Sequence, residues 1–214
     1  MPVKNDREYR DLQLEIRKAD EAEQDHEERM VVEGYASTFN EPYTLYQGDD
    51  FLFQEVVDQN AFANTDMTDV IMQYNHEGRV FARISNNTLT ITPDDKGLFI
   101  SADLGGTELG RELYEEIRGG YTDKMSFGFT VDGEEETRSE DPDGNMTITR
   151  RITSVRKLYD VSAVSIPAND ATSISVRNLS DGVIEKVRAE RLEAEQKELR
   201  KQRIILQLKL IGGQ

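Results

Sequence analysis

Short β-rich stretches follow one another at close spacing through most of this 214-residue chain, and this pattern limits its fold more than any other feature. Each stretch has the length of a strand and ends near turn-forming residues. The predicted strands are Met30–Phe39, Phe51–Val57, Val70–Tyr74, Val80–Ile84, Thr88–Thr92, Leu98–Leu104, Met125–Val131, Met146–Thr153, Lys157–Ile166 and the short run Ser173–Val176. Many short strands with one or two helices indicate a mainly β (α+β) fold, and we expect a closed or nearly closed β-barrel.

Polar and turn-forming segments separate these strands. Apolar residues occupy alternate positions of Leu12–Ile16, which predicts one more strand, and the polar run Ala19–Arg29 predicts a loop or hairpin connection. Pro93–Gly97 has the residues of a hairpin turn. Gly133–Asn145 is acidic and contains Pro and Gly, so we expect an exposed loop there.

One segment, Thr107–Arg118, has a clear helical pattern. Its apolar residues Leu109, Leu113 and Ile117 recur at every fourth position, as on one face of a helix. The first residue of the segment can cap the helix N-terminus, and Gly119-Gly120 can end it. We therefore predict a single helix within the strand-rich region.

The last part of the chain, from about Asp181, has a different composition. Gly and Pro are absent between Val183 and Ile211, while Glu, Lys, Arg, Leu and Ala are abundant. Leu192, Leu199 and Leu206 are seven residues apart, but most companion positions are polar, so the coiled-coil pattern is incomplete. We predict one domain at residues 1–180 and a charged tail at 181–214. The tail is either a solvated helical or disordered extension, or an arm that docks on another helix.

Acidic residues dominate the predicted domain. The chain has 42 acidic and 26 basic residues, which give a formal charge of −16. Residues 31–180 contain 26 of the acidic and 12 of the basic residues, which give this segment a net charge of −14. This charge argues against nucleic acid as the primary partner. The absence of Cys excludes disulfides, a thiolate nucleophile and a thiolate zinc site. No apolar run is long enough for a membrane helix, and the N-terminal residues lack a signal-peptide core, so we expect a soluble intracellular protein.

The chain contains two histidines. His26 lies in a polar run, which predicts a surface residue, whereas His76 follows the apolar strand Val70–Tyr74 and precedes Gly78. His76 is either a structural or surface residue or a near-neutral imidazole at a rim. With His76 the sole plausible nitrogen ligand, zinc is disfavoured. The acidic loop Ser139–Asn145 could bind calcium, but its oxygen spacing does not match an EF-hand, and we predict no cofactor.

Two polar residues interrupt otherwise apolar strands. Ser126 lies in the predicted strand Met125–Val131, where its hydroxyl either bonds the backbone or serves as a nucleophile activated by an imidazole. Gly128 would let another backbone approach closely. Asp160 interrupts Lys157–Ile166, and a buried carboxylate needs a partner, either an imidazolium or an arginine.

An ordered set of short motifs resembles the prohead serine proteases of tailed bacteriophages, the peptidases that mature viral capsids. The set spans roughly residues 9–178 and comprises Val32–Phe39, Phe53-Gln54-Glu55, Ala61-Phe62, Asn75-His76, Lys96-Gly97-Leu98, Gly119-Gly120, Met125–Phe129, Leu158–Ser162 and Pro167-Ala168-Asn169. This family is similar in fold to the herpesvirus assembly proteases (assemblins). The resemblance therefore implies a β-barrel surrounded by helices.

The resemblance also implies an activity and its residues. The family's catalytic His and Ser match His76 and Ser126, and its acidic residue matches Asp160, where Glu is more usual. The implied reaction is acyl transfer with Ser126 as nucleophile and His76 as base. The oxyanion donors stay open between the N–H groups of Phe127 and Gly128 and an arginine, Arg150 or Arg151.

The resemblance further implies a serine endopeptidase that cuts the scaffolding segment of the major capsid protein, and itself, inside the prohead in the host or bacterial cytoplasm. Its partners would be the capsid protein and other copies of itself, with a homo-oligomer possible, and neither nucleic acid nor membrane. The acidic domain leads us to expect a preference for basic or helical scaffold segments. The alternatives are a non-enzymatic scaffold or interaction module acting through its tail, and an acidic metal-binding module.

Overall fold

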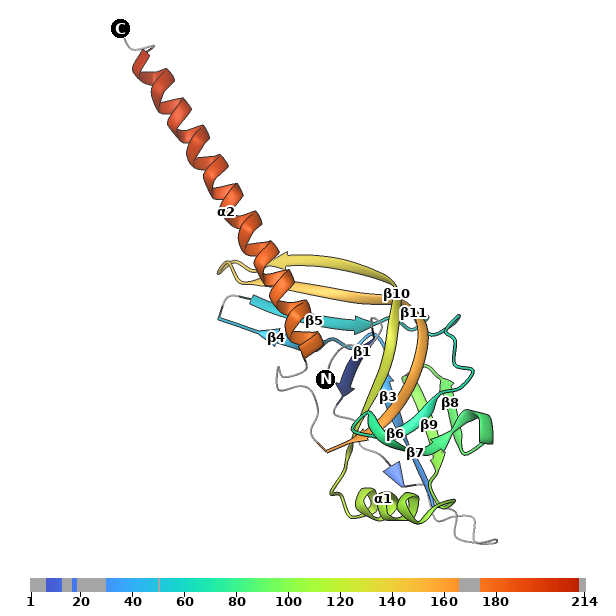
Figure 1. Ribbon diagram of the computed structural model, residues 1–214. Helices are drawn as coiled ribbons and strands as arrows, with labels where there is room; N and C mark the ends of the chain where they lie inside the picture. Colours follow the sequence, from blue (N-terminus) through green and yellow to red (C-terminus); the bar gives the residue numbers. More distant parts are fainter. Residues whose placement is uncertain (1–6, 13–16, 19–29, 50, 166–173, 212–214) are drawn as a thin grey trace. The chain divides into compact units, whose positions relative to one another are not determined.

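The computed structural model describes residues 7–12, 17–18, 30–49, 51–165 and 174–211 (Figure 1). Residues Met1–Val176 and Arg177–Gln214 form two separate compact units. The described residues of the first unit are mainly β and include one α-helix and a short 3-10 helix (Ile84–Asn86), which confirms the predicted α+β class. Its strands are β1 (Glu8–Leu12), β2 (Arg17–Lys18), β3 (Val31–Thr38), β4 (Tyr43–Gln47), β5 (Phe51–Val57), β6 (Ile71–Tyr74), β7 (Glu77–Arg83), β8 (Leu89–Pro93), β9 (Gly97–Asp103), β10 (Lys124–Glu140) and β11 (Met146–Val164).

The strands form two sheets with an apolar core. The larger sheet has the order β1-β10-β11-β5-β4, with β6 and β7 added beside the far end of β11; the smaller has the order β2-β3-β9-β8. Core residues come from both sheets, for example Val32 and Ile100 from the smaller one and Phe127 and Val161 from the larger one. Both sheets therefore bury one face against the same core.

Neither sheet closes into a barrel among the described residues, so the predicted closed barrel is not supported. The larger sheet branches instead, because β11 pairs in parallel with β5 along Met146–Ile152 and with β6 along Asp160–Ala163. The strand pattern of a sequence marks extended stretches, but it does not predict how one long strand is shared between two partners.

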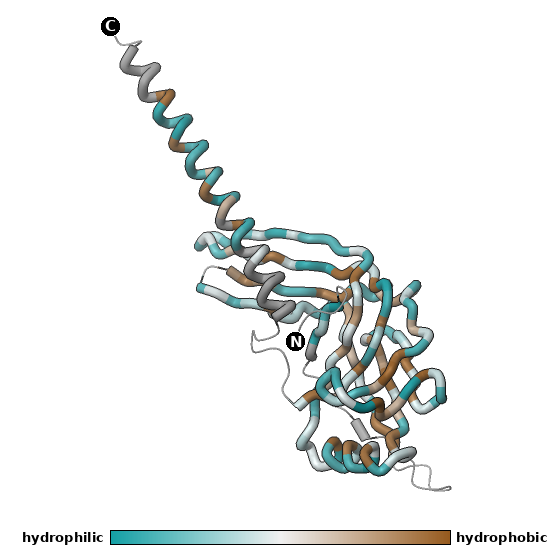
Figure 2. Tube along the Cα trace, in the orientation of Figure 1, coloured by the Kyte–Doolittle hydropathy of each residue, from teal (hydrophilic) through white to brown (hydrophobic). Residues whose placement is uncertain are grey.

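The long hairpin β10/β11 corrects two predictions. Gly133–Glu140 continues β10 instead of forming a loop, and Met146–Val164 is one strand where two were predicted. Four register shifts between Gly128 and Glu134 bend the hairpin while its pairing continues. The outer half of β10 is largely hydrophilic in Figure 2, which explains why its sequence resembles a loop.

The predicted helix and the predicted hairpin turn are confirmed, whereas one short strand was missed. Helix α1 (Glu108–Arg118) forms as predicted and is capped by Thr107, whose hydroxyl accepts the Gly110 N–H at 3.0 Å. The β8/β9 hairpin forms at Pro93–Gly97, and the short strand β4 was not predicted. Of the predicted strand Leu12–Ile16 only Leu12 is described, and residues 19–29 lie outside the described residues.

The tail forms helix α2 (Ile174–Ile211), so a strand at Ser173–Val176 is wrong for the residues described there. Leu192 and Leu199 are exposed on it, and Figure 2 shows scattered hydrophobic residues among hydrophilic ones. No helix within the described ranges is long and apolar enough to cross a membrane.

Candidate active site

His76 lies in a two-residue turn between β6 and β7. Tyr74 pairs with Glu77, so Asn75 and His76 are the two central residues, and both have positive φ angles of 52° and 60°. Positive φ at both positions is typical of a type I′ hairpin turn. A histidine in this left-handed region is strained, and such strain is concentrated at functional sites.

Asn75 fixes this turn to the end of β11. Its backbone N–H donates to the Ala163 carbonyl at 3.0 Å, and its side-chain oxygen accepts the Ser165 N–H at 3.1 Å. The Asn75 amide nitrogen also donates to the Ser165 hydroxyl at 3.3 Å. These hydrogen bonds therefore fix the position of the His76 turn relative to the end of β11.

Ser126 and Asp160 lie on neighbouring strands of the same sheet. Ser126 is opposite Ser162 in the β10/β11 pair, and Gly128 is opposite Asp160. Residues directly opposite one another share a face of an antiparallel pair, so these side chains all lie on one face. A side chain at Gly128 would collide with the Asp160 carboxylate and, at 2.7 Å, with the Tyr9 ring, so this position requires glycine.

The imidazole of His76 joins the other two side chains. Its Nε2 lies 2.5 Å from Ser126 Oγ, and its Nδ1 lies 2.5 Å from Asp160 Oδ1. The side chain of His76 is 11% exposed and that of Asp160 3% exposed, while Ser126 is fully buried. A carboxylate that accepts from Nδ1 leaves Nε2 oriented toward the hydroxyl, which is the arrangement of a nucleophile, a base and an orienting acid.

Two residues in this cluster were not predicted. The Ser162 hydroxyl donates to Asp160 Oδ1 at 3.0 Å, and the Tyr9 ring contacts the His76 imidazole edge to face, with centroids 4.5 Å apart. Ser162 could have been found from its place two residues after Asp160, on the same face of a strand. Tyr9 gave no signal, because its contact depends on the pairing of β1 with β10.

Strand β1 lies directly beside the serine. It pairs antiparallel with β10, with Asp11 opposite Ser126 and Arg10 opposite Phe127. The Ser126 hydroxyl donates to the Arg10 carbonyl oxygen at 3.0 Å. The hydroxyl has a single proton, so Arg10 O and His76 Nε2 compete for it.

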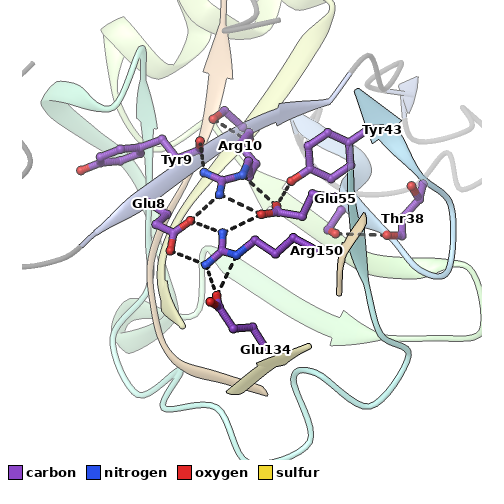
Figure 3. Close-up of polar contacts among 10 residues, drawn as sticks. Glu8, Tyr9, Arg10, Thr38, Tyr43, Glu55, Glu134 and Arg150 are labelled. Carbon is purple, nitrogen blue, oxygen red and sulfur yellow. Dashed lines mark hydrogen bonds and ion pairs between the residues drawn. The ribbon is translucent and has the colours of Figure 1, made fainter. Parts of the chain in front are cut away.

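A second polar cluster, with Arg10, Glu55 and Arg150 buried at its centre, lies on the opposite face of β1, and we refer to it as the ion network. It comprises Glu8, Arg10, Tyr43, Glu55, Glu134 and Arg150 (Figure 3). Arg10 donates to both oxygens of Glu55, from Nε at 2.7 Å and from Nη2 at 2.9 Å. Glu55 is fully buried and also accepts from Arg150 at 2.7 Å and from the Tyr43 hydroxyl.

Three groups of the ion network have strongly shifted pKa values. Burial alone would raise the pKa of Glu8, but the hydrogen bond from Arg150 and the charges of Arg10 and Arg150 lower it to about 2. Burial lowers the pKa of Arg10, but the charges of Glu55 and Glu8 and the hydrogen bond to Glu55 together raise that pKa well above its usual value. Burial and the Glu55 charge raise the pKa of Tyr43. These groups therefore keep their charge states at neutral pH.

The two arginines considered as oxyanion donors bind other side chains in the structure. Arg150 donates to Glu8, Glu55 and Glu134, and Arg151 donates to Asn40 and Asp58 at 2.9 Å each. The guanidinium alternative is therefore wrong for the arrangement seen here, because these groups already bind carboxylates and an amide oxygen.

Phe127 and Gly128, the other oxyanion candidates, lie in β10 where β1 pairs on one side and β11 on the other. Whether their N–H groups donate to an oxyanion stays a prediction.

The other residues considered as functional candidates are His26 and the acidic loop Ser139–Asn145. His26 lies outside the described residues. Within Ser139–Asn145, the Asp141 carboxylate accepts the backbone N–H groups of Asp143 at 3.0 Å and Asn145 at 2.9 Å, as in an ordinary turn. No group of three or more His, Asp or Glu side chains in the described ranges is arranged to hold a metal ion.

The chain matches a protein-family model over most of its length. The model described as caudovirus prohead serine protease matches residues 13–186, which is most of the 214-residue chain. No curated protein and no solved structure matches the chain significantly. The matched region contains His76, Ser126 and Asp160, whereas β1 precedes it.

Proposed function

Since this chain belongs to the caudovirus prohead serine protease family, we propose that it is the endopeptidase that cuts the scaffolding segment of the major capsid protein during capsid maturation, and that it also cuts itself. The family identifies a serine protease and implies contact with phage capsid proteins. The substrate segment, the self-cleavage and the residue roles are the proposed part.

The proposed reaction is acyl transfer through three side chains. Ser126 Oγ attacks the scissile carbonyl carbon while His76 Nε2 takes the hydroxyl proton, and His76 then returns that proton to the leaving amine. Water hydrolyses the resulting acyl-enzyme with His76 again acting as base. Asp160 accepts from Nδ1, holds the tautomer and stabilises the imidazolium.

One observation carries this assignment: the imidazole of His76 lies 2.5 Å from both Ser126 Oγ and Asp160 Oδ1. The three residues come from separate elements, the β6/β7 turn, β10 and β11, so no local sequence constraint brings them together. The shorter Asp side chain reaches the imidazole because Gly128 leaves room for its carboxylate.

We propose residues 1–180 as the protease domain and residues 181–214 as an extension outside it. The proposed partners are the major capsid protein and other copies of this chain, and the proposed place of action is the interior of the prohead in the host or bacterial cytoplasm. The N–H groups of Phe127 and Gly128 are the proposed oxyanion donors.

The test is co-expression of the capsid protein with wild type or with Ser126→Ala, followed by mass spectrometry of both proteins. Wild type is expected to release the scaffolding segment, and the variant is expected to lose about 10⁶-fold in turnover, as when the nucleophile of a triad is removed. A chain truncated after residue 180 is the control for the alternative function. Unchanged cleavage by Ser126→Ala, with assembly lost only on truncation, would instead indicate a scaffold module acting through its tail.

A further inference from the structure

β1 occupies the edge of β10 beside the proposed nucleophile. Its five residues, Glu8–Leu12, pair antiparallel with Met125–Phe129, and within the described part of the chain β1 pairs with β10 alone. Addition of an extended segment to a sheet edge is a common way of binding peptides, because backbone hydrogen bonds supply the affinity. The edge that β1 covers is thus suited to an extended peptide.

The backbone of β1 also presents a carbonyl to Ser126. The Arg10 carbonyl oxygen lies 3.0 Å from Ser126 Oγ, and it accepts the hydroxyl proton that His76 Nε2 would otherwise take. A peptide carbonyl beside the nucleophile is the position that a substrate occupies, but a hydroxyl that donates to that carbonyl does not donate to His76 Nε2, so the serine is not activated. β1 therefore lies as a substrate would, without being positioned for attack.

The side chain of Arg10 fills a charged position that we call the guanidinium site. Glu55 accepts hydrogen bonds from Nε and Nη2 of Arg10, and it also accepts from Tyr43 and Arg150 (Figure 3). The Phe129 ring centroid lies 5.6 Å from the Arg10 guanidinium carbon. A planar fork bound at both oxygens of a buried carboxylate is selective for arginine.

The guanidinium site keeps its negative charge when β1 is absent. Removal of β1 takes one acid, Glu8, and one base, Arg10, out of the ion network. Glu55 and Glu134 then face Arg150 alone, which leaves one carboxylate without a matching cation. A buried carboxylate in this state favours a new cation, so the site would accept a basic side chain from another segment.

We propose that the edge of β10 beside Ser126 binds an extended peptide whose basic side chain enters the guanidinium site, and that β1 fills this edge as a built-in pseudosubstrate. The inference rests on the proposed function, because it takes Ser126 as the nucleophile. The carbonyl that faces Ser126 belongs to Arg10. If a substrate binds as β1 does, the residue immediately before the cut bond is an arginine.

Two diaryl phosphonate probes test the proposal on the full-length chain, since they form a covalent bond with an activated serine. One carries an arginine-like side chain and the other a norleucine side chain of similar length. In Arg10→Gln, β1 holds the edge less firmly. We expect the arginine-like probe to label Ser126 at least about tenfold faster than in wild type, because more molecules present an open site.

The ratio of the two labelling rates reports the guanidinium site. In Arg10→Gln the arginine-like probe is expected to react about tenfold faster than the norleucine probe, and in the double variant with Glu55→Gln the ratio is expected to fall to about one. Because the ratio is internal to each variant, a general loss of fold would abolish both rates instead of equalising them. Arg83→Gln removes an exposed arginine that pairs with Asp69 and is the matched control, with rates like wild type.

Each outcome decides a different claim. Equal rates for the two probes in Arg10→Gln, or no acceleration of that variant over wild type, would overturn the inference and leave the proposed function intact. Failure of both probes to label Ser126 in every folded variant would remove the proposed function, and the inference with it. Peptide mapping of the labelled residue and thermal unfolding of each variant separate these cases.

Discussion

Two buried polar clusters lie on opposite faces of β1 and β10, and they are built differently. The cluster around His76 joins one imidazole to a hydroxyl and a carboxylate, while the ion network joins two arginines to three glutamates. Tyr9 and Arg10 are adjacent in β1, so their side chains point to opposite faces, one toward each cluster.

This difference separates proton transfer from fixed charge. An imidazole is the side chain whose ordinary pKa lies closest to neutral, which makes histidine the usual residue of acid and base catalysis. In the ion network the pKa of Glu8 is lowered and that of Arg10 is raised, so these groups stay charged and hold β1 in place. One cluster is suited to chemistry and the other to anchoring, and each can be broken without direct change to the other.

The largest expected effect is on the first cluster. Asp160→Asn keeps the shape of the side chain but places a donor opposite His76 Nδ1, so the wrong tautomer is favoured. We expect capsid-protein cleavage to slow by about 10⁴-fold, with a much smaller change in the urea midpoint. Rates from purified protein measure this, and a loss of less than about tenfold would separate Asp160 from the chemistry.

The next effect is on the ion network. Arg150→Met removes the cation shared by Glu8, Glu55 and Glu134, and loss of one partner of a buried pair typically costs about 3–5 kcal/mol of unfolding free energy. Urea unfolding measures the change. Arg83→Met, which breaks an exposed pair with Asp69, is the control and is expected to cost about 0–1 kcal/mol. Equal losses in the two variants would deny the ion network its anchoring role.

Acid titration affects the ion network through Glu8. Its pKa is lowered from an ordinary 4.5 to about 2, so its stabilising contribution is fully present above pH 4.5 and is lost as the pH falls toward 2. The stability advantage of wild type over Glu8→Gln is therefore expected to shrink across that window. Thermal unfolding of both proteins from pH 6 downward, in roughly half-unit steps, tests this sign. If the stability difference between wild type and Glu8→Gln stays constant across this pH range, the Glu8 carboxylate does not stabilise the docked β1 strand.

The smallest effect returns to the first cluster. Ser162→Ala removes one neutral donor to the Asp160 carboxylate, and a single hydrogen bond contributes about 1 kcal/mol, or roughly fivefold in kcat/KM. If Ser162 positions Asp160, the loss falls on kcat and shifts the pH profile of cleavage, whereas a structural role would move the unfolding midpoint alone. Ser162→Thr, which keeps the hydroxyl, is expected to recover part of the rate.

The proposed catalytic residues could be predicted from the sequence because each carries a local signal. Ser126 and Asp160 interrupt apolar strands, and His76 follows a buried strand at a turn. That these three residues act together was implied by the resemblance to the prohead serine proteases. The hairpin turn at Pro93–Gly97 and the cap at Thr107 were likewise local, and both are confirmed.

The ion network and the outer hairpin depend on distant partners. Arg10 is 45 residues from Glu55 in the sequence, and Glu8 is 142 residues from Arg150, so no local pattern announces their pairing. Glu55 does interrupt an apolar strand, as Asp160 does, and the same argument would have marked it as a residue in need of a partner. Gly133–Glu140 looked like a loop because a strand that is exposed and charged differs from a loop only through its partner, β11.

The turn at Asn75 and His76 has a consequence for selection experiments. A glycine at position 76 would adopt the observed φ of 60° without the steric penalty that histidine carries, a difference of order 1 kcal/mol. That relief is smaller than the cost of the change, because glycine would leave the buried Asp160 carboxylate without its imidazole partner. Selection for heat resistance alone would therefore retain this histidine, so the imidazole also belongs to what keeps the folded state intact.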